Sequence, residues 1–269
     1  MMDPILVAGI LVLTGAVAGV FAGLMGVGGG FLMVPVQYAL LTASGMEGTL
    51  ATRVAFGTSL AVILPTAVVA TWGHHRKSAV DWQAAVTMGL AAVGGSLLGG
   101  TLASFTPGHV LRAIFGVVLL LMAGRMLLDL RECSECPLRG GLPEYLLLGF
   151  LIGMISGLAG VGGGTLAVPL MVIFLGFPMY RAVGTSAACL IFSAAGGVTA
   201  YAFHGAGVAG LPPGSLGYLY LPWWALLVVT TIPFTLAGVR GAYVLGPQRL
   251  RKIFALVLAG IALAMFLTG

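Results

Sequence analysis

The sequence is poor in charge and contains no asparagine. Only 7% of its 269 residues are Asp, Glu, Lys or Arg, whereas 59% are hydrophobic, and the mean hydropathy is +1.12. Soluble domains carry about 25% charged residues, so this chain could not cover a water-facing surface. The lack of Asn excludes N-glycosylation. The apolar runs are long enough for membrane helices, and we expect an all-α polytopic membrane protein.

Acidic residues are equally scarce, and none lies well inside an apolar run. All seven fall at the ends of runs or between them. This excludes an intramembrane carboxylate relay and favours anionic over cationic cargo. No Ser/His/Asp or His/Glu arrangement is present, so we expect no enzyme, no cofactor and no bound metal. The basic pI of about 9.4 is interpreted as a membrane topology signal, not as nucleic-acid binding.

Cysteine is rare as well, with Cys133, Cys136 and Cys189 in the whole chain. Cys133 and Cys136 form a CxxC pair, which can serve redox or metal chemistry. A lone pair supplies only two of the four ligands of a structural zinc site. An ordinary loop is the simpler interpretation, with a membrane redox or assembly role as the alternative.

Charges, prolines and glycines divide the chain into about ten apolar segments. They span residues 5–26, 29–43, 50–72, 82–104, 110–128, 145–161, 163–177, 183–203, 219–240 and 250–268. The second and seventh segments are short. At 1.5 Å per residue they reach roughly 22 Å, less than the hydrocarbon core of about 30 Å.

The second half of the chain repeats the first. Residues 19–35 and 153–169 are identical at 11 of 17 positions, and a Gly-Thr-Ser motif follows each block. A duplicated half is typical of secondary transporters. We therefore expect an N-terminal transmembrane repeat over 1–128, a cytoplasmic linker over 129–144 and a C-terminal repeat over 145–269, which together form one transport unit.

The basic residues favour an inverted relation between the two repeats. If every segment crosses the membrane and the N-terminus is outside, ten Lys and Arg lie inside, and only Arg53 and Arg112 lie outside. If the short segments do not cross, the split is five to seven. Lys and Arg concentrate in cytoplasmic loops, so we expect inverted repeats with both termini outside.

The repeated glycine block predicts a helix break inside the membrane. Glycine permits a tight turn, and the first amides of the helix after a break are unpaired at its positive dipole end. Such amides suit an anion. We expect the substrate-binding backbone to comprise Gly28, Gly29, Gly30 and Phe31 in the first repeat and Gly162, Gly163, Gly164 and Thr165 in the second. Close helix packing is the alternative, and it is our interpretation of Gly19, Gly23, Gly153 and Gly157.

Hydroxyl groups recur beside these breaks and could complete the anion site. Thr58 and Ser59 in the first repeat correspond to Thr185 and Ser186 in the second, and Ser156 is a further candidate. Such hydroxyls also commonly bond to helix carbonyls. Arg53 could attract an anion, although a snorkelling role at a helix end fits it equally.

The paired glycine blocks, each followed by a Gly-Thr-Ser segment, resemble the TauE/SafE family of sulfite and organosulfur-anion permeases. The resemblance covers essentially the whole chain. It implies a multi-pass transporter of the inner membrane that carries small anions such as sulfite, sulfoacetate or thiosulfate, by alternating access of the two repeats. A passive anion channel is the alternative. The expected partners are the small anion and the lipid bilayer, and a homodimer is left open.

Overall fold

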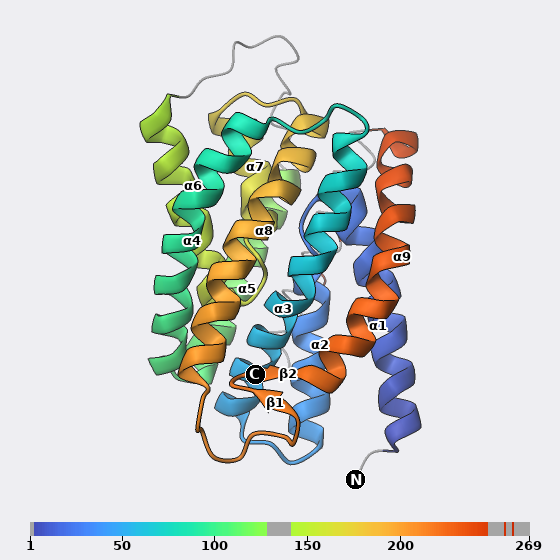
Figure 1. Ribbon diagram of the computed structural model, residues 1–269, viewed down its shortest axis with the longest axis vertical. Coiled ribbons are helices and arrows are strands. Elements are labelled where there is room, and N and C mark those ends of the chain that lie inside the picture. Colours follow the sequence, from blue (N-terminus) through green and yellow to red (C-terminus); the bar gives the residue numbers. More distant parts are fainter. Residues whose placement is uncertain (1–2, 128–140, 247–255, 257–259, 261–269) are drawn as a thin grey trace.

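The computed structural model describes residues 3–127 and 141–246, together with residues 256 and 260. Within these residues the chain forms nine α-helices and one short β-ribbon (Figure 1). In chain order they are α1 (Pro4–Met25), α2 (Gly30–Ala43), α3 (Gly48–His75), α4 (Trp82–Phe105), α5 (Gly108–Leu127), α6 (Leu142–Ala159), α7 (Gly164–Phe174), α8 (Met179–His204), β1 (Ser215–Leu216), β2 (Leu219–Tyr220) and α9 (Leu221–Leu245).

Six of the described helices are long and apolar enough to cross a membrane, namely α1, α3, α4, α6, α8 and α9. The all-α polytopic membrane architecture is therefore confirmed. The tenth expected segment, 250–268, lies outside the described residues apart from 256 and 260. The helix bounds differ from the expected segments by several residues. α3 extends through His74 and His75, beyond the expected end at 72, and α6 begins at Leu142, before the expected start at 145.

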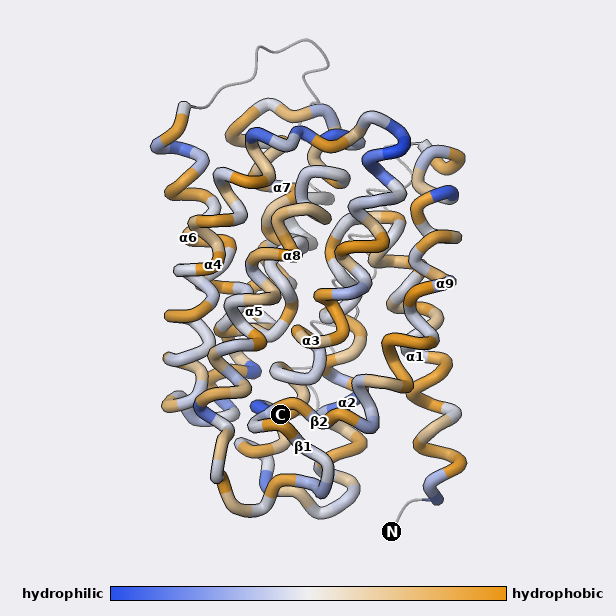
Figure 2. The backbone as a smooth tube through the Cα atoms, in the orientation of Figure 1, coloured by the Kyte–Doolittle hydropathy of each residue, from blue (hydrophilic) through white to orange (hydrophobic). Residues whose placement is uncertain are grey.

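Acidic residues fix the beginnings of three helices. Asp3, Glu47 and Asp81 each accept hydrogen bonds from first-turn amides of α1, α3 and α4. Such caps satisfy amides that have no partner within a helix. Hydrophilic segments gather at the two ends of the bundle, and the tube between them is mainly apolar or neutral (Figure 2). The scarce charges thus mark helix ends, as the sequence predicts.

The helices that carry the Gly-Thr-Ser motifs run in opposite directions. α3 starts at the end of the bundle where α1 begins, and α8 ends there (Figure 1). We call this end the N-terminal face; it also holds the β-ribbon and the starts of α5 and α9. The opposite end, called the linker face, holds the ends of α3 and α9 and the starts of α4, α6 and α8. α3 is the most buried of the six long helices.

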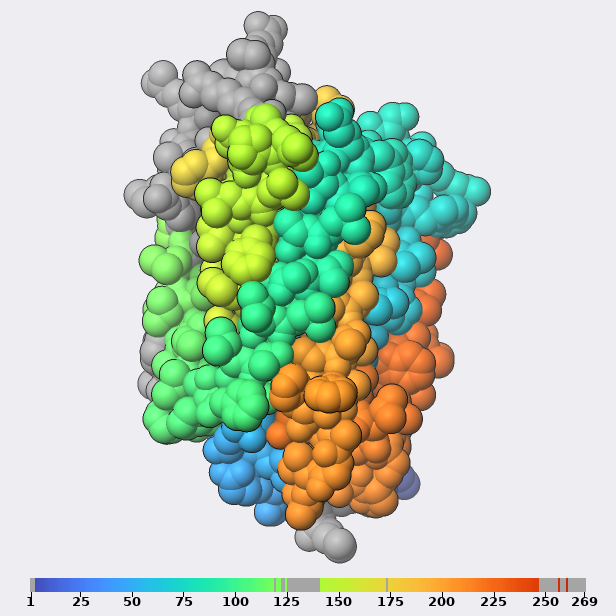
Figure 3. All heavy atoms as spheres, turned by 60° about the vertical axis from the view of Figure 1, so that its left-hand side comes forward, coloured from blue at the N-terminus to red at the C-terminus, as the bar shows by residue number. Residues whose placement is uncertain are grey.

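Helices of one sequence half pack along helices of the other half. α1 lies along α9 (Figure 1), and α4 lies along α6 and α8 (Figure 3). A Cβ atom placed on Gly19 would lie 2.5 Å from the carbonyl oxygen of Thr231, and one on Gly153 would lie 2.2 Å from that of Ala92. Only glycine permits such approaches. The prediction that Gly19, Gly23, Gly153 and Gly157 are packing residues is confirmed.

Candidate functional site at the crossing of two interrupted helices

The first glycine block forms a break between α1 and α2. α1 ends at Met25 and is capped by Gly26 in the left-handed conformation. Gly28 and Gly29 follow with φ of 77° and 75°, and α2 begins at Gly30. Residues other than glycine rarely adopt these backbone angles. The glycine cluster therefore encodes the break directly.

The second block repeats this geometry. α6 ends at Ala159 with Gly160 as its left-handed cap, Gly162 and Gly163 have φ of 81° and 75°, and α7 begins at Gly164. The predicted helix break is thus present in both copies of the motif.

The two breaks pack directly against each other. A Cβ atom on Gly30 would lie 3.2 Å from the Cα atom of Val161, and one on Gly164 would lie 2.6 Å from the Cα atom of Val27. Val27 and Val161 are buried, at 0% and 2% exposure. Residues 27–30 and 161–164 therefore cross inside the protein, where irregular backbone is tolerated in a membrane.

Two apolar side chains cover the crossing. A Cβ atom on Gly28 would lie 2.8 Å from Cγ2 of Ile63, and one on Gly162 would lie 2.9 Å from Cδ1 of the same residue. Leu190 of α8 stands 3.0 Å from the corresponding position on Gly164. Ile63 and Leu190 are buried and follow the two Gly-Thr-Ser motifs at the same spacing. In this conformation the breaks are closed by hydrocarbon.

Carbonyl groups of both breaks are satisfied by hydroxyls of α8. Ser186 Oγ donates to the carbonyl of Gly26 at 3.0 Å, and Ser193 Oγ donates to that of Gly162 at 2.9 Å. The amides of Gly30 and Gly164 open their helices and have no carbonyl acceptor within them. The positive end of each helix dipole lies at these amides. The N-terminal ends of two helices thus meet at the crossing.

The threonines of the Gly-Thr-Ser motifs join the two sequence halves. Thr58 Oγ1 accepts the amide hydrogen of Tyr220 at 2.9 Å, and Thr185 Oγ1 accepts that of Asp81 at 3.0 Å. Tyr220 precedes α9, and Asp81 precedes α4. Each threonine therefore holds the loop of the other half against its own central helix.

Ser59 is hydrogen-bonded to Gln37, which was not among the expected site residues. Gln37 of α2 donates from Nε2 to Ser59 Oγ at 3.1 Å, and both side chains are completely buried. Gln37 Oε1 has no hydrogen-bond partner. A buried amide inside an apolar membrane helix is costly and signals function. This signal was already readable in the sequence, where Met171 occupies the corresponding place in the second repeat.

The remaining predicted polar residues lie beside the crossing or away from it. Thr165 and Ser156 are buried, and Ser156 Oγ, next to Gly163, has no hydrogen-bond partner. Phe31 is buried and meets Phe21 edge to face at 6.1 Å. Thr165, Ser156 and Phe31 are all among the expected site residues.

Arg53 lies apart from the breaks, towards the N-terminal face. Its Nη1 is 3.4 Å from the hydroxyl of Tyr218, and its Nη2 donates to the carbonyl of Thr106 at 3.2 Å. Phe56, one turn further along α3, contacts the second break, because a Cβ atom on Gly160 would lie 2.5 Å from Cβ of Phe56. Along α3, Phe56 therefore lies between Arg53 and Ile63, which covers the crossing.

A histidine and a tyrosine bind the helix ends before the breaks. His74 Nε2 lies 3.0 Å from the carbonyl oxygen of Gly23, and Tyr201 donates from its hydroxyl to that of Gly157 at 2.9 Å. His74 Nδ1 lies 2.9 Å from the hydroxyl of Tyr243. The carbonyl at Nε2 requires that nitrogen to carry the hydrogen, so Nδ1 accepts from the tyrosine.

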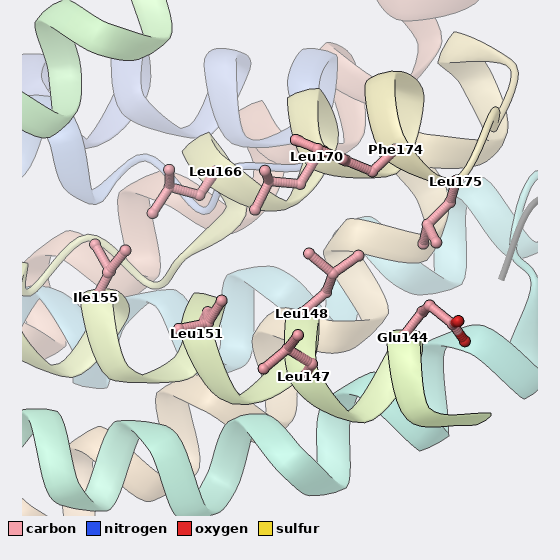
Figure 4. A pocket seen from close by; sticks show the side chains of 9 residues that line it. All are labelled: Glu144, Leu147, Leu148, Leu151, Ile155, Leu166, Leu170, Phe174 and Leu175. Atoms are coloured by element: carbon pink, nitrogen blue, oxygen red, sulfur yellow. The ribbon is translucent and has the colours of Figure 1, made fainter. Parts of the chain in front are cut away.

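A separate cavity of about 630 Å³ opens between α6 and α7 (Figure 4). Eight of its nine lining side chains are apolar, and Glu144 lies at one end. A carboxylate is an acceptor and repels anions, so this cavity offers no donors to the expected cargo. Cys133 and Cys136 lie outside the described residues.

Comparisons with known proteins give one consistent result. The family described as sulfite exporter TauE/SafE matches residues 11–265. A "probable membrane transporter protein" of Haemophilus influenzae is 32% identical over 258 residues, which cover 95% of this chain and 96% of that protein. One of Methanocaldococcus jannaschii with the same description is 26% identical over 96% of this chain and 95% of its own. No solved structure matches the chain.

Proposed function

Because the chain belongs to the sulfite exporter TauE/SafE family, we propose that it is a secondary transporter that carries small sulfur-containing anions by alternating access. The chain is a multi-pass membrane protein with relatives described as probable membrane transporters, and the family is one of transporters and not of enzymes. We propose the alternating-access mechanism and the class of cargo, which comprises sulfite, thiosulfate and sulfoacetate.

The observation that carries the proposal is the meeting of two helix N-termini inside the protein. Gly30 and Gly164 begin α2 and α7 at a buried crossing, with no charged side chain among the residues that form it. Backbone amides and dipole ends can bind an oxyanion there without a buried arginine. Ser156, which lies next to Gly163, and the hydrogen-bonded pair of Ser59 and Gln37 are the proposed additional polar contacts.

An inverted-repeat arrangement of ten membrane segments is part of the proposal. It is supported by the opposite directions of α3 and α8, which carry equivalent motifs, and by the matching bonds of Thr58 and Thr185. Inverted repeats allow the same site to open to either side in turn. Ile63 and Leu190, which cover the breaks, would have to move for an anion to enter. This requirement favours a gated transporter over an open anion channel.

The proposed orientation places the N-terminal face outside the inner membrane of the cell. Among the described side chains, Arg53 and Arg112 lie towards this face, whereas Arg76, Lys77, Arg181 and Arg240 lie towards the linker face. The excess of basic residues marks the cytoplasmic side.

Transport and binding should be measured on the purified protein. In proteoliposomes, we expect saturable uptake of radiolabelled sulfite or thiosulfate, and both anions should raise the unfolding temperature in detergent, as mass action requires. Gly163→Val should abolish both effects, since Gly163 has positive φ and contacts Ile152 and Ser156.

Gly94→Val is the matched control, because Gly94 is exposed on α4 and a Cβ atom there meets nothing within 4 Å. It should retain uptake. Wild-type protein that neither transports nor binds any sulfur oxyanion would contradict the proposal, and flux that does not saturate would favour a channel.

A further inference from the structure

Two arginines near the N-terminal face are bound to tyrosines instead of carboxylates. Arg53 of α3 reaches the Tyr218 hydroxyl, and its Cζ lies 5.9 Å from the centroid of that ring. Arg112 of α5 donates to the Tyr38 hydroxyl, with its Cζ 4.6 Å from the centroid of that ring. Hydroxyls and rings orient a guanidinium but do not neutralise it.

Neither arginine makes an ion pair in the part of the chain that the structure describes. The one ion pair recorded there joins Arg181 to Asp81 at the linker face. Nε of Arg53 and Nε of Arg112 are both buried and have no hydrogen-bond partner. A partly buried cation with an unused donor is unfavourable unless an anion joins it.

Both described acidic residues at this face cap helices. Asp3 caps α1 and accepts the amide hydrogen of Ile5 at 2.9 Å, and Glu47 caps α3. Both carboxylate oxygens of Glu47 accept amide hydrogens, at 3.0 Å from Thr49 and 3.0 Å from Leu50. These hydrogen bonds, with a smaller contribution from the charge of Arg53, hold the pKa of Glu47 below its usual value. Glu47 therefore serves as a helix cap, and it makes no ion pair with either arginine.

Packing of α5 on α3 brings the two arginines to one region. A Cβ atom on Gly108 would lie 2.7 Å from the Cα atom of Thr49, so the first turns of the two helices touch. Phe56 and Phe115 are completely buried, and their rings stack at 6.0 Å with an interplanar angle of 29°. Each phenylalanine lies three residues after one of the arginines. The stacked rings thus form an apolar floor one turn below both guanidinium groups.

We propose that Arg53 and Arg112 form an anion-capture vestibule at the N-terminal face, and that the Phe56–Phe115 stack closes it from the helix breaks. The ligand is a small oxyanion with at least two acceptor oxygens, such as sulfite or a sulfonate, which guanidinium groups bind through paired N–H donors. This inference rests on the proposed function, for which it names the residues of first contact. Phe56 also touches Gly160, so movement of the stack would open the path from the vestibule to the crossing.

The vestibule predicts that a mutation there affects capture of the anion but not its later translocation. Removal of one guanidinium should weaken the first encounter with the anion but leave the later steps intact. In Arg112→Gln, the KM for sulfite applied at the N-terminal face should rise about tenfold, the loss of one hydrogen bond to a charged group, while kcat changes less than twofold. Sulfite applied at the linker face should show an unchanged KM. The KM of Arg112→Lys at the N-terminal face should lie between those of the wild type and Arg112→Gln, since lysine keeps the charge but loses the planar fork.

Arg240→Gln provides the matched control, because it removes the same charge from an exposed position towards the linker face. Its KM at the N-terminal face should equal that of the wild type. A wild-type KM in both Arg53→Gln and Arg112→Gln would overturn the vestibule, as would an equal rise of KM from both faces. Absence of transport in the wild type would instead contradict the proposed function, so the two failures are distinguishable.

Anion binding at the vestibule is checked by a measurement that needs no transport. Sulfoacetate, which does not react with the aldehyde of phenylglyoxal, should protect Arg112 from phenylglyoxal modification in wild-type protein in detergent, detected by peptide mass spectrometry, while Arg240 stays unprotected. Equal modification of Arg112 with and without sulfoacetate, in protein that sulfoacetate stabilises against heat, would also overturn the vestibule.

Discussion

His74 and Tyr201 make the same contact in the two halves of the chain. Each follows the threonine of its Gly-Thr-Ser motif at the same spacing, and each hydrogen-bonds a glycine carbonyl in the last turn of the helix before a break, Gly23 or Gly157. Last-turn carbonyls have no acceptor role within their own helix. Two chemically different side chains thus perform one task, which is to stabilise the end of an interrupted helix.

Removal of either group should destabilise the protein. In Tyr201→Phe the ring stays and the Gly157 carbonyl loses its donor, which should cost about 1–2 kcal/mol of unfolding free energy. His74→Phe should cost at least as much, because it also leaves the hydroxyl of Tyr243 without its acceptor. Thermal unfolding in detergent measures both. An unfolding temperature equal to that of the wild type in both variants would show that the carbonyls find other donors.

The glycine break should tolerate no side chain at Gly28. Alanine there would have to adopt a φ of 77° and would meet Cγ2 of Ile63 at 2.8 Å. Strain and overpacking together should cost about 2–4 kcal/mol. The control is Gly94→Ala, which should be neutral or stabilising by up to about 1 kcal/mol. Equal stabilities of the two variants would indicate that the break rearranges freely.

Gln37 should matter for transport more than for stability. Gln37→Met places the residue of the second repeat, Met171, at this position and removes a buried amide with an unpaired oxygen. Replacement of a half-satisfied buried polar group by an apolar one is often neutral or stabilising. We expect an unchanged or higher unfolding temperature together with at least a tenfold loss of sulfite uptake. Full uptake in this variant would exclude Gln37 from the substrate site.

Thr185 should be required as a hydrogen-bond acceptor. Thr185→Val keeps the shape of the side chain but leaves the half-buried amide of Asp81 without its partner, which should cost about 1–2 kcal/mol. Thr185→Ser should restore most of this loss. As a control, Thr199→Val removes a hydroxyl that bonds only within its own helix and lies at an exposed place. If Thr185→Val and Thr199→Val have equal effects on unfolding, the link between the halves contributes nothing measurable.

The sequence predicted those features that depend on local chemistry. Gly28 and Gly162 encode their breaks because few other residues accept a positive φ, so the breaks were visible as clustered glycines. Gly19 and Gly153 follow the small-residue pattern of close packing. These expectations need no knowledge of which segment packs against the glycines.

Features that depend on distant contacts were not predictable in this way. Thr58 and Thr185 stand out in the sequence as hydroxyl donors, but their observed partners are amides more than a hundred residues away. His74 lies beyond the expected apolar segment 50–72, whereas the structure extends α3 through it and buries it against α1. Gln37 was overlooked because a single amide forms no motif.

The packing of α1 against α9 determines when the fold can be completed during synthesis. α1 is synthesised long before α9, so the face that carries Gly15, Gly19 and Gly23 receives its partner only when α9 has been made. Until then this face has no protein partner from α9. The packing of the first half of the chain is therefore completed only by a helix of the second half, even though each half carries its own copy of the motif.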